Sequence, residues 1–141
     1  MFARILLPVD LEEESSWEKA IPAVLALRET FGSELHVLTI TPEWPKGMYR
    51  LSLPANFEQQ LAASAAAGLD TFLREHMPEG LSVTRHVKVG SVYRMILETA
   101  ADIAADLIVM VSHRPEMADY LIGANASRVV RHAEVSVLVI R

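Results

Sequence analysis

The chain alternates between two hydrophobic patterns along its whole length. Short apolar runs rich in β-branched residues are typical of buried strands, and longer stretches with apolar residues three or four positions apart are typical of amphipathic helices. Their alternation favours a doubly wound α/β fold, in which a five-stranded parallel sheet carries helices on both faces through right-handed crossovers. The predicted strands are 4–9, 35–40, 83–89, 107–111 and 136–140, and the predicted helices are 15–31, 56–76, 90–105 and 123–132.

Several residues mark where these elements begin and end. Ser15 and Glu18 fit a capping box, so the first helix is expected to begin at Ser15. Gly32 stands where a left-handed residue would end that helix, and Asn56 is expected to cap the second helix. In 83–89, valines alternate with polar residues, which places this strand at or near an edge of the sheet.

Length and composition fit one globular domain that covers residues 1–141. Hydrophobic residues make up 51% of the chain and charged residues 22%, which is typical of a folded protein with a proper core. The absence of cysteine excludes disulfides, thiolate metal sites and cysteine nucleophiles. The formal net charge is −5 and the basic residues are scattered, which argues against nucleic-acid binding.

The start of the chain and its apolar runs bear on location. Met1 to Arg4 lead directly into the first predicted strand, with no basic and apolar leader. No apolar run reaches the roughly 18 residues that a membrane helix needs. We therefore expect a cytoplasmic protein that does not bind membranes.

One crevice of the predicted fold combines strand ends with a helix start. Ligands of open parallel sheets bind beyond the carboxyl ends of the strands, where the winding reverses. If the first strand is central and the fourth is its neighbour, 8–10 and 110–112 flank that crevice, and Gly123 opens the last helix beside them. The N–H groups of 125–127 at the positive helix end suit a phosphate. The carboxylate of Asp10 suits ribose hydroxyls or a metal on the phosphates.

Each of these residues also has a purely structural interpretation that involves no ligand. Asp10 could cap its own loop, and Gly123 could belong to an ordinary tight turn. His113 could polarise a phosphate or form a structural hydrogen bond. The acidic run 12–14 could be a solvated helix entry or a cation site beside a ligand, and the irregular stretch 41–55 could be a lid.

The chain lacks the motifs of several common chemistries. It contains no P-loop, no Gly-x-Gly-x-x-Gly, no His-Glu-x-x-His and no Gly-x-Ser-x-Gly frame. We therefore predict no catalytic residue and no protein-held metal site. A phospho-acceptor receiver would need an acidic pair, a central Asp and a Lys in the last strand, whereas that strand offers only Arg141.

Six stretches taken in order make the chain resemble the universal stress protein family over essentially all of its length. The resemblance implies a sheet of the adenine-nucleotide alpha-hydrolase type with strand order 3-2-1-4-5. It also implies ATP binding with Mg²⁺, a regulatory role in stress with slow hydrolysis at most, and a homodimer formed through the last strand, Val137 to Arg141. The stretches are Ile5-Leu6-Leu7-Pro8-Val9-Asp10, Gly90, Asp106-Leu107-Ile108-Val109-Met110, Leu121-Ile122-Gly123, Val129-Val130-Arg131-His132-Ala133 and 136–141.

The phosphate-binding motif of the family is altered in this chain. Its nucleotide-binding members carry Gly, two residues, Gly, nine residues, then Gly-Ser or Gly-Thr. Here Val111 and Arg114 take the first two glycine positions, and Ala124 replaces the hydroxyl residue. The Ser-His-Arg-Pro loop at 112–115 and the Gly-x-Asn-Ala turn at 123–126 resemble a branch that is similar to proteins that hold ATP. Arg114 could pair with phosphate oxygens or be a solvated loop residue.

The resemblance also assigns roles residue by residue. Pro8, Val9 and Asp10 would line the adenine and ribose side, Ile40 would place its backbone against the adenine, and Met110 would lie under the nucleotide. The loss of nucleotide binding, leaving a dimeric interaction scaffold, is the alternative that the altered motif keeps open. The residues expected around the phosphates are Ser112, His113, Arg114, Gly123, Ala124, Asn125, Ala126 and Ser127.

Overall fold

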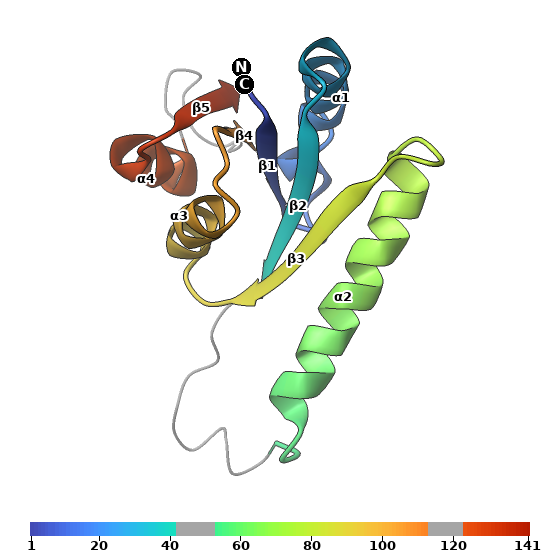
Figure 1. Ribbon diagram of the computed structural model, residues 1–141. Helices are drawn as coiled ribbons and strands as arrows, with labels where there is room; N and C mark the ends of the chain where they lie inside the picture. Colours follow the sequence, from blue (N-terminus) through green and yellow to red (C-terminus); the bar gives the residue numbers. More distant parts are fainter. Residues whose placement is uncertain (42–52, 113–122) are drawn as a thin grey trace.

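Five parallel strands form one sheet in the order β3-β2-β1-β4-β5 (Figure 1). The computed structural model describes residues 1–41, 53–112 and 123–141. The predicted α/β class and strand order are confirmed. The strands are β1 (Arg4–Val9), β2 (Glu34–Thr41), β3 (Val83–Val89), β4 (Leu107–Val111) and β5 (Ser136–Ile140).

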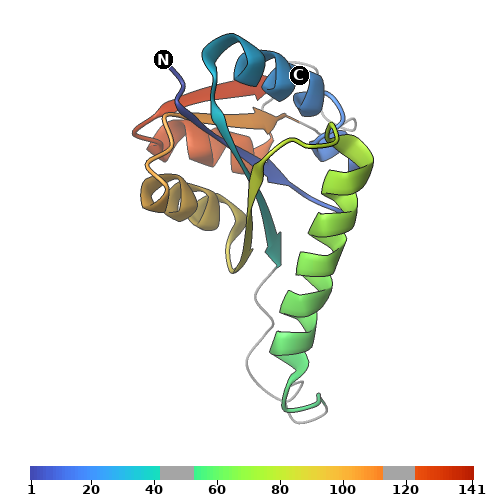
Figure 2. The same ribbon diagram turned by 45° about the vertical axis from the view of Figure 1, so that its right-hand side comes forward.

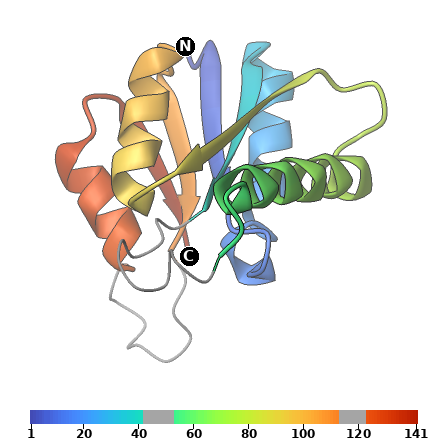
Figure 3. The ribbon, with the colours of Figure 1, turned by 90° about the horizontal axis from the view of Figure 1, so that it is seen from below.

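Helices cover both faces of the sheet. Residues of α1 and α2 pack in one buried cluster, and residues of α3 and α4 pack in the cluster on the opposite face. Viewed from below, α3 and α4 run side by side (Figure 3). The helices are α1 (Ala20–Phe31), α2 (Phe57–His76), α3 (Val92–Asp102) and α4 (Ala124–His132), with a short 3-10 helix η1 (Glu14–Ser16) before α1.

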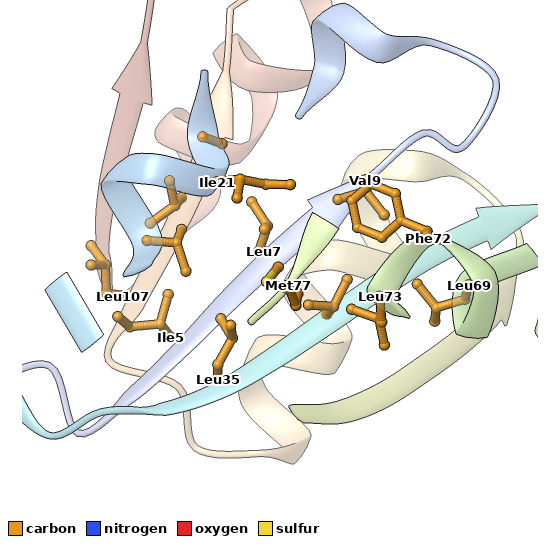
Figure 4. Packing of buried hydrophobic residues seen from close by; sticks show 14 residues of the cluster. Ile5, Leu7, Val9, Ile21, Leu35, Leu69, Phe72, Leu73, Met77 and Leu107 are labelled. Carbon is orange, nitrogen blue, oxygen red and sulfur yellow. The ribbon is translucent and has the colours of Figure 1, made fainter. Parts of the chain in front are cut away.

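The central strand β1 is buried on both faces, which explains its unbroken apolar sequence. Ile5 and Leu7 point into the cluster under α1 and α2 (Figure 4), while Leu6 belongs to the cluster under α3 and α4. All three side chains are fully buried. The carboxyl end of this strand is thereby fixed in the middle of the sheet.

Helix α2 joins this core through its second half only. Leu69, Phe72 and Leu73 are its buried residues, and Trp17 lies edge-on to Phe72 at 4.9 Å between ring centroids. The first turns of α2 extend beyond the end of β2 (Figures 1 and 2). In the described part of the chain, no helix is both long and apolar enough to cross a membrane.

The prediction that the first helix begins at Ser15 is wrong. The α-helix begins at Ala20, and the Ser15 hydroxyl donates a hydrogen bond to Glu13 Oε1 at 2.6 Å instead of capping a helix. The Ser16 hydroxyl forms hydrogen bonds with the backbone N–H and carbonyl of Asp10, and these bonds hold the segment in a turn. The predicted left-handed C-cap is confirmed at Gly32, with φ 65°.

Two further helix boundaries differ in detail. Asn56 does precede α2, but its side chain accepts a hydrogen bond from Gln60 Nε2 at 3.3 Å and caps no backbone N–H. Helix α3 ends at Asp102, earlier than the predicted 105, because Ala104 adopts a positive φ of 53° that ends the helical path. The predicted edge position of β3 is confirmed.

Candidate functional site

A cavity of about 250 Å³ opens where the winding of the sheet reverses. The connection after β1 leads to α1 on one face, and the connection after β4 leads to α4 on the other. Ligands of doubly wound folds bind at this position. The lining residues are Pro8, Val9, Asp10, Glu13, Ser16, Ile40, Val92, Ile96, Met110, Val111, Gly123, Ala124, Asn125 and Ala126.

Most of the predicted binding residues meet around this cavity. The end of β1 supplies 8–10, β2 supplies Ile40, β4 supplies Met110, and the start of α4 supplies 123–126. These segments are far apart in the sequence, and the parallel sheet brings their ends to one edge. The juxtaposition that the sequence predicts is therefore present in the structure.

Two predicted residues lie beside the cavity without lining it, and two cannot be placed. The hydroxyl of Ser112 accepts a hydrogen bond from the N–H of Gly123 at 3.2 Å. The N–H of Ser127 donates to the carbonyl of Gly123 at 2.9 Å, inside the helix. His113 and Arg114 lie outside the described residues, as do 42–52 of the predicted lid.

The Asp10 end of the cavity is held by hydrogen bonds to its backbone. Ser16 Oγ accepts from the N–H of Asp10 at 3.0 Å and donates to the carbonyl of the same residue at 3.1 Å. One carboxylate oxygen, Oδ1, accepts from the N–H of Glu12 at 3.1 Å. Asp10 thus caps its own loop and also lines the cavity, so the two interpretations of this residue are compatible.

The opposite end of the cavity is the amino end of α4. The first-turn N–H groups of a helix lack partners in the helix, and together they carry a positive partial charge. The first turn of α4 contains no acidic residue, and its last turn contains Arg131, whose positive charge complements the negative end. The start of α4 can therefore receive an anion through the N–H groups of 124–126.

The backbone conformation at position 123 does not require a glycine. Its φ of −56° and ψ of 152° are open to any residue, so a positive-φ turn does not explain the glycine. The residue lines the cavity and gives its N–H to Ser112. The glycine therefore leaves this part of the cavity wall without a side chain.

Charge and polarity are distributed unevenly around the cavity. Asp10 and Glu13 lie on the β1 side, the amino end of α4 lies opposite, and much of the remaining wall is apolar. Such a wall suits a flat aromatic base, with hydroxyls near the carboxylates and an anion at the helix. Within the described residues, no group of three or more His, Cys, Asp or Glu side chains could hold a metal ion.

Five lining residues are absent from the predicted set: Glu13, Ser16, Val92, Ile96 and Val111. Two of them could have been identified from the sequence. Glu13 belongs to the acidic run 12–14, and Val111 replaces a glycine of the family motif. The position of Ser16 depends on the turn that replaces the predicted first helical turn. Val92 and Ile96 reach the cavity because α3 packs across the end of β2, which no local pattern encodes.

Together, the sheet order and the position of the cavity define an open α/β protein with a cavity at the carboxyl ends of its central strands, where ligands of such folds bind. A receiver of the flavodoxin-like type has the order 2-1-3-4-5, which this sheet does not have. The chain belongs to the universal stress protein family, whose match covers residues 1–141.

Individual relatives agree with this assignment. Universal stress protein G of Shigella flexneri is 33% identical over 147 residues that cover all of both chains. Universal stress protein UspA from Lactobacillus plantarum has a TM-score of 0.74 at 21% identity, over 99% of this chain and 98% of that one. A universal stress protein solved in complex with cAMP has a TM-score of 0.62 at 16% identity, over 99% and 97%.

Proposed function

We propose that the cavity binds an adenine nucleotide, ATP with Mg²⁺, and that the protein acts as a nucleotide-dependent regulator in a stress response. The observation that carries this proposal is the meeting of Asp10 and the amino end of α4 across one largely apolar cavity. The base would lie against Ile40 and Met110, the ribose hydroxyls at Asp10, and the first phosphate at the N–H groups of 124–126.

The comparisons support the choice of ligand. A neighbour with the same fold was solved in complex with cAMP, which is itself an adenine nucleotide. We expect hydrolysis to be slow at most. Among the described residues that line the cavity there is no histidine or lysine that could serve as a general base beside the phosphates.

The altered motif favours a second candidate, a family member that works as an interaction scaffold without nucleotide. Val111 places a branched side chain in the cavity wall, and Ala124 offers no hydroxyl at the start of α4. The loss of one hydrogen bond to a phosphate costs about 1–1.5 kcal/mol, or roughly tenfold in affinity. In either case we propose a homodimer that forms along the edge of β5.

Thermal unfolding with and without Mg-ATP separates the two candidates. A ligand at 100 times its Kd stabilises the folded state by about 2.7 kcal/mol, which raises the Tm of a domain of this size by roughly 5–11 °C. No shift at millimolar Mg-ATP would favour the scaffold.

The variant Gly123→Val tests the placement of the phosphates. The extended backbone at Gly123 accepts valine, so the unliganded Tm should stay close to that of the wild type. The new side chain beside the first turn of α4 should abolish the shift with Mg-ATP. An undiminished shift would show that the phosphates bind elsewhere.

A further inference from the structure

The segment that follows β1 forms one side of the cavity. Three of its residues, Asp10, Glu13 and Ser16, line the cavity. The segment is closed by its own hydrogen bonds, because the N–H of Glu13 donates to the carbonyl of Asp10 at 3.1 Å and the Ser16 hydroxyl bonds both backbone groups of Asp10. We call residues 10–17 the cavity loop. Its hydrogen bonds set its shape, and its position is set by what the loop packs against.

The cavity loop packs against α2 near both of its ends. Near its start, Leu11 lies against Gly68. At its end, the Trp17 ring lies edge-on to Phe72 and tilted against His76, with 4.9 Å and 4.3 Å between ring centroids. The chain after β1 accordingly runs beside α2 (Figure 2). No residue of α2 is among the described residues that line the cavity, so the helix influences the cavity through this loop.

Space beside Leu11 explains the glycine at position 68. Glycine is a poor helix former, and Gly68 lies inside α2 without the positive φ that would favour it. A Cβ atom at this position would lie 3.2 Å from Cδ1 of Leu11, which is closer than ordinary van der Waals contact. The missing side chain therefore lets Leu11 lie close to the backbone of the helix.

Leu11 connects this contact to the carboxylate of Asp10. It stands between Asp10 and Glu12, and the N–H of Glu12 donates a hydrogen bond to Oδ1 of Asp10 at 3.1 Å. A shift of Leu11 away from α2 moves the backbone on both sides of it, including the N–H that orients this oxygen. The walls expected around the base and the phosphates belong to other elements, β2, β4 and α4. The Asp10 side of the cavity is therefore the side that Gly68 controls.

We propose that Gly68 is a positioning residue, which sets the selectivity of the cavity for a ligand with ribose hydroxyls by holding Leu11 and Asp10 in place. This assignment rests on the proposed nucleotide function, in which the ribose hydroxyls bind at Asp10. A carboxylate accepts hydrogen bonds from hydroxyls only within a narrow range of distance and angle. The preference for a ribonucleotide over its dideoxy analogue therefore depends on a glycine outside the cavity lining.

Calorimetric titration of the full chain with ATP and with dideoxy-ATP, in the same Mg²⁺ buffer, tests the assignment. Dideoxy-ATP lacks both ribose hydroxyls and keeps the base and the phosphates, so the ratio of the two dissociation constants isolates the hydroxyls. The test variants are Gly68→Leu and Gly68→Ala, which add a large and a small side chain against Leu11. The matched control is Ala66→Leu, at an exposed position on the other side of the same helix.

We expect the wild type to bind ATP about tenfold more tightly than dideoxy-ATP, as the loss of hydrogen bonds at Asp10 implies. Gly68→Leu should remove most of this preference by weakening ATP, while its Kd for dideoxy-ATP stays close to that of the wild type. Gly68→Ala should remove a smaller part, because Leu11 then needs only a small shift. Ala66→Leu should keep the wild-type preference.

A second substitution separates positioning from general damage to the fold. When Gly68→Leu is combined with Leu11→Ala, the smaller loop residue makes room for the new side chain, so part of the preference for ATP should return. The melting temperature of each variant without ligand shows whether it is folded. If Gly68→Leu does not fold, the preference measured for Gly68→Ala decides.

Contrary outcomes for the assignment and for the proposed function can be told apart. The assignment would be overturned by an unchanged preference in the folded Gly68 variants, by an equal loss for both ligands, or by a loss that Leu11→Ala does not relieve. A wild type that binds both ligands equally well would also overturn it, and nucleotide binding would stand. A wild type that binds neither ligand would overturn the proposed function, and the assignment with it.

Discussion

Gly90 is the residue whose backbone most requires glycine, with a φ of +146°. A Cβ atom at this position would lie 3.3 Å from Cγ of Met95. Gly90 also donates its N–H to the carbonyl of Thr41 at 3.0 Å, immediately before the N-cap of α3. It thereby sets the start of the helix that brings Val92 to the cavity.

We predict that Gly90→Ala lowers the free energy of unfolding by about 1–3 kcal/mol, because alanine must adopt a strained φ against Met95. Urea unfolding measures the loss. The matched control is Gly32→Ala, where φ is +65° and no atom lies within 4 Å of the added Cβ. That variant should lose about 1 kcal/mol. A loss at Gly90 no larger than the one at Gly32 would contradict the steric argument.

The structural role of a residue can be predicted from the sequence where the local pattern alone determines that role. Gly32 follows from its position after an amphipathic stretch, and Asp10 follows from its position at the end of an apolar strand. Ser16 does not follow in this way, because its hydroxyl can either cap a helix or bind the backbone of Asp10. The choice between the two depends on the turn after β1, which no periodic pattern encodes.

At the scale of elements, β2 and β3 are joined by a pair of histidines. His36 Nδ1 and His86 Nε2 are 2.9 Å apart, and the two rings stack with centroids 5.2 Å apart. His36 is almost fully buried, and its Nε2 lies 3.5 Å from Glu34 Oε1, while Oε2 of the same carboxylate pairs with Arg4. A single proton between the two ring nitrogens satisfies this contact, whereas two protons would oppose each other.

Burial lowers the pKa of His86 below its ordinary value of 6.5, and the positive charges of His36 and Lys88 lower it further, against the opposing effect of Asp102. A folded pKa below the unfolded one means that the unfolded chain binds the proton first. The stabilising contribution is therefore complete above pH 6.5, and it is lost as the pH falls below that value.

We predict that the free energy of unfolding decreases between about pH 7.5 and 5.5, on either side of the ordinary histidine pKa, and that His86→Gln makes the decrease smaller. Glutamine can still hydrogen-bond to His36 but does not titrate. Urea unfolding at both pH values measures the difference. The control His132→Gln, at the exposed end of α4, should keep the wild-type difference. The same pH dependence in His86→Gln and the wild type would rule out His86 as its source.

Element order is more predictable than element ends in this chain. Every strand lies within about a residue of its predicted range, because unbroken apolar runs mark the buried central strands and alternating valines mark β3. Helix ends depend on single hydrogen bonds instead. The side chains of Ser15 and Asn56 both bind other side chains rather than the backbone, so the caps expected from composition do not form.

For the whole molecule, the location of the cavity follows from the alternation of strands and helices. Parallel strands end at one edge, so 8–10, Ile40 and Met110 had to meet there. The part of the cavity wall that α3 contributes cannot be predicted from this alternation. Val92 and Ile96 reach the cavity through the packing of α3 against β2 and α4, which depends on the twist of the sheet and on the volume of many side chains.

The sheet has two edges, and they differ in their outer residues. On β5, Leu138 is 38% exposed, and Val130 of the neighbouring helix α4 is 46% exposed. On β3, the opposite edge, Val89 is 51% exposed, and polar residues alternate with the valines. An apolar edge strand invites pairing with a second copy, whereas charged residues on an edge oppose it.

We predict that Leu138→Lys shifts the protein from dimer to monomer, because the lysine must lose its water shell to enter an interface along β5. Sedimentation equilibrium over a range of concentrations measures the dissociation constant, and the melting temperature shows whether the variant stays folded. The matched control is Val89→Lys, which places the same charge on the other edge strand and should leave the dimer intact.

Two outcomes would contradict this prediction. If Val89→Lys dissociates the dimer and Leu138→Lys does not, the interface lies along β3. A monomeric wild type at all concentrations would remove the homodimer from the proposed function without contradicting the proposed nucleotide site, whose described lining residues belong to one chain.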